Sequence, residues 1–134
     1  MPHLTLEYSA NLHPEGRIGE LCQALAATLE AQLDEEDRAV YPIGGVRVRA
    51  LRCDDYCVAD GSPDIGFVHA TLKIAAGRTD AVKRSTGDAL FEEIKRHFAD
   101  QFSTRGLALS LELQEFGESG TWKHNNLHAR FRKD

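Results

Sequence analysis

Apolar and polar residues alternate along four short segments of the chain, at residues 4–8, 45–52, 67–74 and 107–114. The last segment is the clearest, because leucine occupies every second position from Leu107 to Leu113. Such alternation is typical of a β-strand with one buried face. The pattern therefore predicts a sheet that is covered on one side only. Its other face carries Thr, Ser, His, Arg and Glu side chains, and we expect it to meet water, a ligand or another subunit.

Two longer segments repeat their apolar residues every three or four positions instead. They run from about residue 15 to residue 33 and from about residue 80 to residue 102. This spacing predicts two amphipathic helices. Thr79 stands where it can cap the start of the second helix, and Gly106 lies just beyond its end. The predicted elements then follow in the order β-α-β and again β-α-β.

This order predicts an α+β fold, a two-layer α/β sandwich built from duplicated β-α-β units. Right-handed crossovers would place both helices on one face of a four-stranded mixed sheet. We interpret residues 2–58 and 67–115 as pseudo-repeats, joined by the turn-rich residues 60–66. The 134 residues suit a single domain. The polar residues 116–134 are expected to form a C-terminal arm that lies on a neighbouring subunit.

Composition and charge narrow the range of partners. The chain has 16 Lys and Arg against 21 Asp and Glu, a net charge of −5, which argues against a nucleic-acid partner. No apolar run approaches the roughly 20 residues that span a bilayer. The start, Met1-Pro2-His3-Leu4, lacks the basic and apolar regions of a signal peptide. We therefore expect a cytoplasmic protein with a small-molecule ligand and no membrane partner.

The cysteines and histidines show no metal-binding pattern. Cys22, Cys53 and Cys57 are an odd number and are expected to be reduced thiols. Cys53 and Cys57 have no matching second pair, whereas a zinc site usually needs four convergent ligands. The six histidines show no HExxH or paired spacing. We therefore predict no metal site.

Pro2 is the first residue of chemical interest. Methionine before a small second residue is usually removed in the cytoplasm, and its removal here would leave Pro2 with a free secondary amine. Burial or neighbouring cations would lower the pKa of that amine and make it a general base near neutral pH. A Met-Pro start by itself favours a structural or processing role.

Arginines are the second feature, because they are placed at predicted strand ends in an acidic chain. Arg47 and Arg49 are expected on the polar face of the second strand with Arg52 nearby, and Arg78 lies at the turn into the second helix. Ligands gather at strand ends in α/β layers, and a guanidinium suits bidentate capture of a carboxylate. The alternative is pairing with surface Asp or Glu, which we favour for Arg49 and Arg52.

A series of short motifs runs in order along nearly the whole chain: Met1-Pro2-His3, Gly45-Val46-Arg47, Ala59-Asp60-Gly61, Phe67-Val68-His69, Thr71-Leu72-Lys73-Ile74, Ala76-Gly77-Arg78, Leu107-Ala108-Leu109-Ser110 and Asn125-Asn126. With these motifs the chain resembles the 5-carboxymethyl-2-hydroxymuconate isomerase family. That family belongs to the tautomerase superfamily, with the fold of 4-oxalocrotonate tautomerase and macrophage migration inhibitory factor. Residues 11–43 match weakly, and residues 117–122 differ in length and content.

The resemblance implies a homotrimer with sites near subunit boundaries, acting in homoprotocatechuate breakdown, a branch of aromatic compound catabolism. It implies that Pro2 is first the base and then the acid that moves a proton between carbons of an enol acid, here 5-carboxymethyl-2-hydroxymuconate. Arg47 and Arg78 would bind the substrate carboxylates, and no metal or organic cofactor is required. We assign no catalytic role to five other matched residues: His3, His69, Lys73, Asn125 and Asn126.

Two other interpretations stay open. RNA-recognition modules share the element order, and Gly66-Phe67-Val68-His69-Ala70 is similar to part of their strand motif. That motif needs a basic residue before the glycine, where this chain has Ile65, and net charge opposes it. The other interpretation is a relative that binds a carboxylate without turnover, or a tautomerase with another enol-acid substrate, because a fold does not fix a function.

Overall fold

A computed structural model describes residues 1–132 of the chain. Four strands form one sheet in the order β2-β1-β3-β4: β1 (His3–Ser9), β2 (Arg47–Cys53), β3 (Gly66–Ala75) and β4 (Leu107–Phe116). β1 is parallel to β2, β3 is parallel to β4, and the central pair β1 and β3 is antiparallel. The predicted four-stranded mixed sheet is therefore confirmed.

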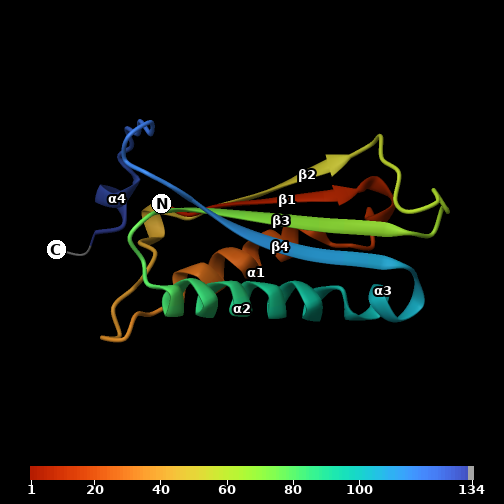
Figure 1. Ribbon diagram of the computed structural model, residues 1–134, viewed down its shortest axis with the longest axis horizontal. Coiled ribbons are helices and arrows are strands. Elements are labelled where there is room, and N and C mark those ends of the chain that lie inside the picture. The colour runs from red at the N-terminus through yellow and green to blue at the C-terminus, as the bar shows by residue number, and fades with distance from the viewer. Residues whose placement is uncertain (133–134) are drawn as a thin grey trace.

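The two main helices, α1 (Ile18–Glu30) and α2 (Asp80–His97), lie side by side on one face of the sheet (Figure 1). Shorter helical segments connect or end the main elements: η1 (Ala10–Leu12), η2 (Ile43–Gly45), α3 (Ala99–Thr104) and α4 (Leu127–Arg130). This is the predicted α+β two-layer architecture. None of the helices within residues 1–132 combines the length and hydropathy needed to cross a bilayer.

The core lies between the sheet and the helices. Leu4 and Leu6 of β1 and Leu72 of β3 are fully buried, and they pack with Leu25 of α1 and Leu90 of α2. Burying a side chain of this size contributes about 1.5–3 kcal/mol. The polar residues that alternate with them stand on the opposite, helix-free face of the sheet, as the period of two predicts.

Thr79 caps α2 as predicted, since its hydroxyl accepts a hydrogen bond from the Val82 amide at 3.2 Å. The predicted helix over 80–102 is wrong in one respect: it is two helices, because Phe98 leaves helical geometry at φ −100° and ψ 15°. The apolar spacing continues through this break, so the pattern could not reveal it. α1 begins at Ile18 rather than near residue 15, after Arg17 adopts left-handed backbone geometry.

The C-terminal segment returns to its own subunit. α4 packs on η2 so closely that a Cβ built on Gly44 would stand 2.8 Å from the backbone nitrogen of His128. Only glycine allows this approach. α4 is therefore anchored on its own subunit, and the expectation that the arm also lies on a neighbour stays a prediction. The last two residues of the predicted arm, 133–134, lie outside the described residues.

Candidate active site

The amino terminus lies at one edge of the sheet, beside α4 (Figure 1). His3 pairs with Arg47 of β2 and with Lys73 of β3, and the Arg47 amide donates to the Pro2 carbonyl oxygen at 3.1 Å. Continuing the antiparallel register by two residues brings Met1 level with Ala75, where β3 ends. Pro2 is buried, so the start of the chain is held within the fold.

Arg47 is the first residue of β2 and is half-buried beside this amino terminus. Its Nη1 donates to the carbonyl oxygen of Gly44 at 3.1 Å. That bond uses one of the five guanidinium N–H donors, so the others remain available to a carboxylate. The structure therefore places Arg47 where the sequence predicted a carboxylate-binding side chain.

Arg78 follows the end of β3 and is fixed by three contacts. Its Nη1 donates to the Ala75 carbonyl oxygen at 3.0 Å, and its Nη2 donates to the Val40 carbonyl oxygen at 3.3 Å. Its guanidinium carbon stands 4.8 Å from the centre of the Tyr41 ring, within the range of a cation–π interaction. These contacts hold the guanidinium in one orientation.

The Tyr41 ring supports the Arg78 guanidinium through this cation–π contact. It is 1% exposed, and its hydroxyl lies 2.9 Å from the hydroxyl of the fully buried Thr86 on α2. The bond joins residues 45 positions apart in the chain. The position of Arg78 thus depends on a buried contact between the loop before η2 and helix α2.

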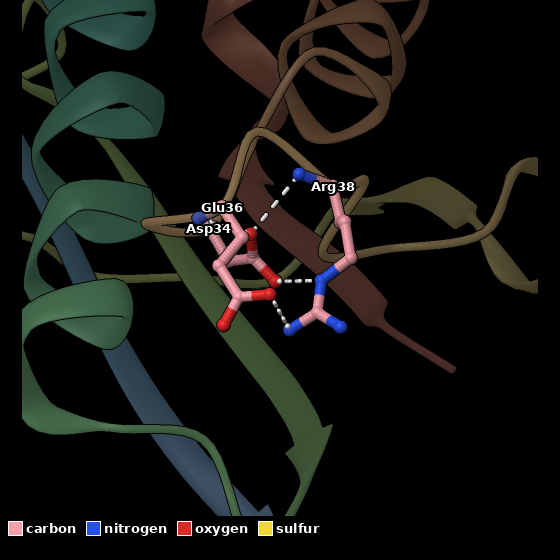
Figure 2. Close-up of polar contacts among 3 residues, drawn as sticks. All are labelled: Asp34, Glu36 and Arg38. Carbon is pink, nitrogen blue, oxygen red and sulfur yellow. Dashed lines mark hydrogen bonds and ion pairs between the residues drawn. The ribbon is translucent and has the colours of Figure 1, made fainter.

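The loop that carries Val40 and Tyr41 is closed by a small ionic turn, shown in Figure 2. The Asp34 carboxylate accepts hydrogen bonds from the amides of Glu36 at 2.8 Å and Arg38 at 3.0 Å, and from Arg38 Nε at 3.2 Å. Arg38 also pairs with Glu36 at 3.2 Å. The hydrogen bonds to the Asp34 carboxylate lower its pKa, and the bond from the Arg38 amide lowers it most.

Three cations lie close enough to the amino group to lower its pKa. Burial lowers the pKa of the Met1 amine most, and the charges of Arg78, Lys123 and Arg47 lower it further, in that order. Each lowers it by disfavouring the positively charged form of the amine. The site therefore combines an amine biased toward its neutral form with side chains that attract anions.

A cavity of about 380 Å³ adjoins this edge of the sheet. Its walls come from the end of β3 and from the segment after β4: Ala75, Ala76, Phe116, Gly117, Glu118, Thr121 and Lys123. Its volume is within the range of small-molecule sites. Lys123 belongs both to this cavity and to the cations that act on the amine, whereas Arg47 and Arg78 do not line the cavity. A small polycarboxylate suits this end of the sheet, because cations and a neighbouring cavity occur there together.

The other matched residues have structural contacts. His3 lies 3.2 Å from Arg49, and its pKa is lowered by burial and then by the charges of Arg49, Arg47, the amino terminus and Lys73. The prediction that Arg49 pairs with an acid is therefore wrong, because the neutral His3 ring accepts its hydrogen bond. Arg52 does pair with Asp54, at 3.0 Å.

His69 lies away from the amino terminus. It pairs with Glu7 across the central strands, four residues along β3 from Lys73, a separation of roughly 13 Å. Its ring bonds to Ser110 at 2.6 Å and approaches Glu112 at 3.4 Å. Near the C-terminus, the Asn125 side chain accepts a bond from the Leu127 amide at 3.0 Å, a local turn before α4. These contacts tie His69 to the sheet and Asn125 to a local turn, and the absence of a catalytic role for both residues stays a prediction.

Two residues of this candidate site, Lys123 and Tyr41, escaped the sequence prediction. Lys123 stood in a polar run with no period, and Tyr41 stood in a stretch that matches the family weakly. The available signal for Tyr41 was its position between Val40 and Pro42, an apolar run in an otherwise polar loop. Within residues 1–132, no three His, Cys, Asp or Glu side chains gather as a metal site.

Comparison with known proteins gives full-length matches. A family model described as 5-carboxymethyl-2-hydroxymuconate isomerase matches residues 2–131. The 5-carboxymethyl-2-hydroxymuconate Delta-isomerase of Escherichia coli is 39% identical over 132 residues, which cover 98% of this chain and 100% of that protein. The crystal structure of a 5-carboxymethyl-2-hydroxymuconate isomerase from Deinococcus radiodurans R1 is 54% identical with a TM-score of 0.88, covering 98% of this chain and 95% of the other.

The fold extends to more distant proteins. A macrophage migration inhibitory factor-like protein of Entamoeba histolytica superposes with a TM-score of 0.61 over 92% of this chain and 95% of its own, at 13% identity. At that identity the likeness concerns the fold alone. It agrees with the tautomerase architecture that the motifs implied.

Proposed function

The chain belongs to the 5-carboxymethyl-2-hydroxymuconate isomerase family, and we propose that it isomerises 5-carboxymethyl-2-hydroxymuconate with the nitrogen of Pro2 as the proton carrier. The observation that carries the proposal is the buried amino terminus beside Arg78, Lys123 and Arg47, where the pKa of an amine is lowered. This is the environment that a nitrogen base needs in order to work near neutral pH.

Removal of Met1 turns the amide nitrogen of Pro2 into a secondary amine at the same edge of the sheet. The amine takes the proton of the 2-hydroxyl group of the substrate, and the electron pair left behind spreads over the conjugated system as a dienolate. The prolinium formed then returns a proton to a carbon of that system, and the hydroxyl group becomes a carbonyl group. The double bonds shift, and no atom is gained or lost.

Arg47 and Arg78 bind substrate carboxylates in this mechanism. Proton removal adds a negative charge to a substrate that is already anionic, and fixed guanidiniums stabilise that charge best where water is excluded. The three contacts that hold Arg78 limit the reorganisation needed as the charge develops. The same cations lower the pKa of an amine at this end of the chain and so favour its neutral form.

We further propose a cytoplasmic homotrimer that acts in homoprotocatechuate breakdown. Support comes from the helix-free face of the sheet, where Leu51 is 53% exposed, and from the free thiols Cys22, Cys53 and Cys57. Light scattering should give a mass about three times the 14.9 kDa of the chain. A monomeric, fully active protein would contradict the trimer.

The decisive experiment is an ultraviolet assay of 5-carboxymethyl-2-hydroxymuconate, because isomerisation shortens the conjugated system. Protein that lacks Met1, verified by intact mass, should turn the substrate over. Pro2→Ala should keep ligand binding and lose most turnover, whereas Pro63→Ala, at an exposed turn, should remain active.

Two results would reject the proposal. Full activity of protein that retains Met1 contradicts the proline base, because an amide nitrogen is not basic. Failure of the processed protein to turn the substrate over points to another enol acid or to binding without turnover.

A further inference from the structure

Lys123 is the third cation of this site, and it lies in a segment without helix or strand. It lies in the segment between β4 and α4, and both ends of that segment are anchored. At one end the Ala76 amide donates to the Phe116 carbonyl oxygen at 2.9 Å. At the other end α4 packs against Gly44. The segment therefore brings Lys123 back to the edge of the sheet where the chain begins.

Within the segment, a short turn shapes the cavity wall. The Thr121 hydroxyl donates to the Gly117 carbonyl oxygen at 2.8 Å, and the Thr121 amide bonds to the Glu118 carbonyl oxygen at 3.3 Å. Ala75 and Ala76 line the same cavity, and their small side chains occupy little of its space. The turn and the alanines together give a cavity of about 380 Å³ with Lys123 on its lining.

The charge of Lys123 is not neutralised by the protein. Within residues 1–132 no carboxylate lies within 4.0 Å of its ammonium group, although Glu118 lines the same cavity. By contrast, Lys83 and Lys95 each contact an acid, at 3.2 Å and 2.6 Å. An unpaired ammonium group that lines a cavity attracts an anionic group of a ligand.

We propose that Lys123 binds the carboxymethyl carboxylate of the substrate and so makes the site selective for tricarboxylates over dicarboxylates. This inference rests on the proposed function. Arg47 and Arg78 account for two carboxylates, and 5-carboxymethyl-2-hydroxymuconate carries a third. A flexible lysine suits that third group, because it acts as a point charge and needs no bidentate geometry.

The test compares two substrates that differ in one carboxylate: 5-carboxymethyl-2-hydroxymuconate and 2-hydroxymuconate. Lys123→Gln should lower kcat/KM for the tricarboxylate about 10- to 100-fold, mainly through KM, as expected for loss of a charge-assisted bond. It should lower kcat/KM for the dicarboxylate much less when both proteins are compared on the pH-independent plateau of their profiles, because the effect of the Lys123 charge on the pKa of the amine no longer matters there. Lys123→Arg should restore most of the preference. The matched control Lys95→Gln, on the exposed side of α2, should behave as the wild type.

An equal loss on both substrates would overturn the proposal, since it would mean a general effect on folding or on the amine. Unchanged selectivity in Lys123→Gln would overturn it as well.

Binding separates this inference from the proposed function. Propane-1,2,3-tricarboxylate and glutarate share a carbon chain and differ by one carboxylate, and calorimetry measures their affinities without any turnover. Wild-type preference for the tricarboxylate, abolished in Lys123→Gln, supports the third-carboxylate site even if the enzyme assay fails. Equal affinity of the wild type for the two acids overturns it even if the assay succeeds.

Discussion

Replacing Tyr41 by phenylalanine removes one hydroxyl from beneath Arg78 and keeps the ring. The lost partner is the Thr86 hydroxyl at 2.9 Å, which is fully buried and has no other bonding partner among residues 1–132. Leaving a buried hydroxyl unpaired costs about 1–3 kcal/mol. Thr86→Val leaves the Tyr41 hydroxyl unpaired instead and should cost a similar amount.

The double variant Tyr41→Phe/Thr86→Val should cost less than the sum of the two single variants. Removing both partners leaves no polar group unpaired, so the free energy of unfolding should approach the wild-type value. A coupling of about 1 kcal/mol or more is expected for residues in direct contact. Activity should change little in Tyr41→Phe, because the ring that faces Arg78 remains.

Urea unfolding at one fixed protein concentration measures these differences, since the stability of an oligomer depends on concentration. Tyr41→Leu should lose activity as well as stability, because it removes the cation–π contact, worth about 0.5–2 kcal/mol. Additive single costs would refute the claim that the two hydroxyls act as a pair. Full activity in Tyr41→Leu would refute the claim that the Tyr41 ring positions Arg78.

Three further perturbations test other parts of the site. Arg78→Gln should move the acid limb of the kcat/KM pH profile to higher pH, because the pKa of the amine rises when the nearby cation is lost. An acid limb at the wild-type pH would exclude an effect of Arg78 on the amine. Asp34→Asn should destabilise the protein near neutral pH and match the wild type in acid. The pKa of Asp34 is lowered in the folded state, so its carboxylate stabilises the fold above the ordinary carboxyl pKa of about 4, and this stabilisation is lost as pH falls through the folded pKa. A difference in urea unfolding that does not change with pH would contradict this. Gly44→Ala should displace α4, expose the C-terminal segment to protease and lower the free energy of unfolding by about 1–3 kcal/mol. The control Gly87→Ala should do neither, because the space around that glycine is open. Equal protease resistance of the two variants would contradict the packing of α4.

The sheet was predictable because alternation directly expresses one-sided burial. In β3, Val68, Ala70 and Leu72 point to the helices and their neighbours to the other face, as the period of two requires. The division between α2 and α3 was not predictable, because Phe98 and Phe102 continue the apolar spacing although only Phe98 is buried. Periodicity records which side chains are apolar and not where the backbone leaves the helix.

The site was predictable only where a motif or a strand end marked it. Arg78 stands in a run that resembles the family, and Arg47 opens a strand. Lys123 and Tyr41 reach the site through contacts between distant parts of the chain. The segment that carries Lys123 is anchored where Phe116 bonds to Ala76, and the Tyr41 hydroxyl bonds to Thr86. No local pattern encodes such long-range packing.

The topology explains why these cations meet at the amino group. β1 is central and runs parallel to β2, so both strands begin at one edge of the sheet. β3 is antiparallel to β1, and β4 is parallel to β3, so both of these strands end at that same edge. The start of β2 supplies Arg47, the end of β3 leads to Arg78, and the end of β4 leads to Lys123. A backbone amine placed at the start of the central strand is therefore approached by one cation from each of the other three strands. An amine at the start of this strand therefore takes its electrostatic environment from the order of the strands together with the segments that follow β3 and β4, and it needs no side chain of its own.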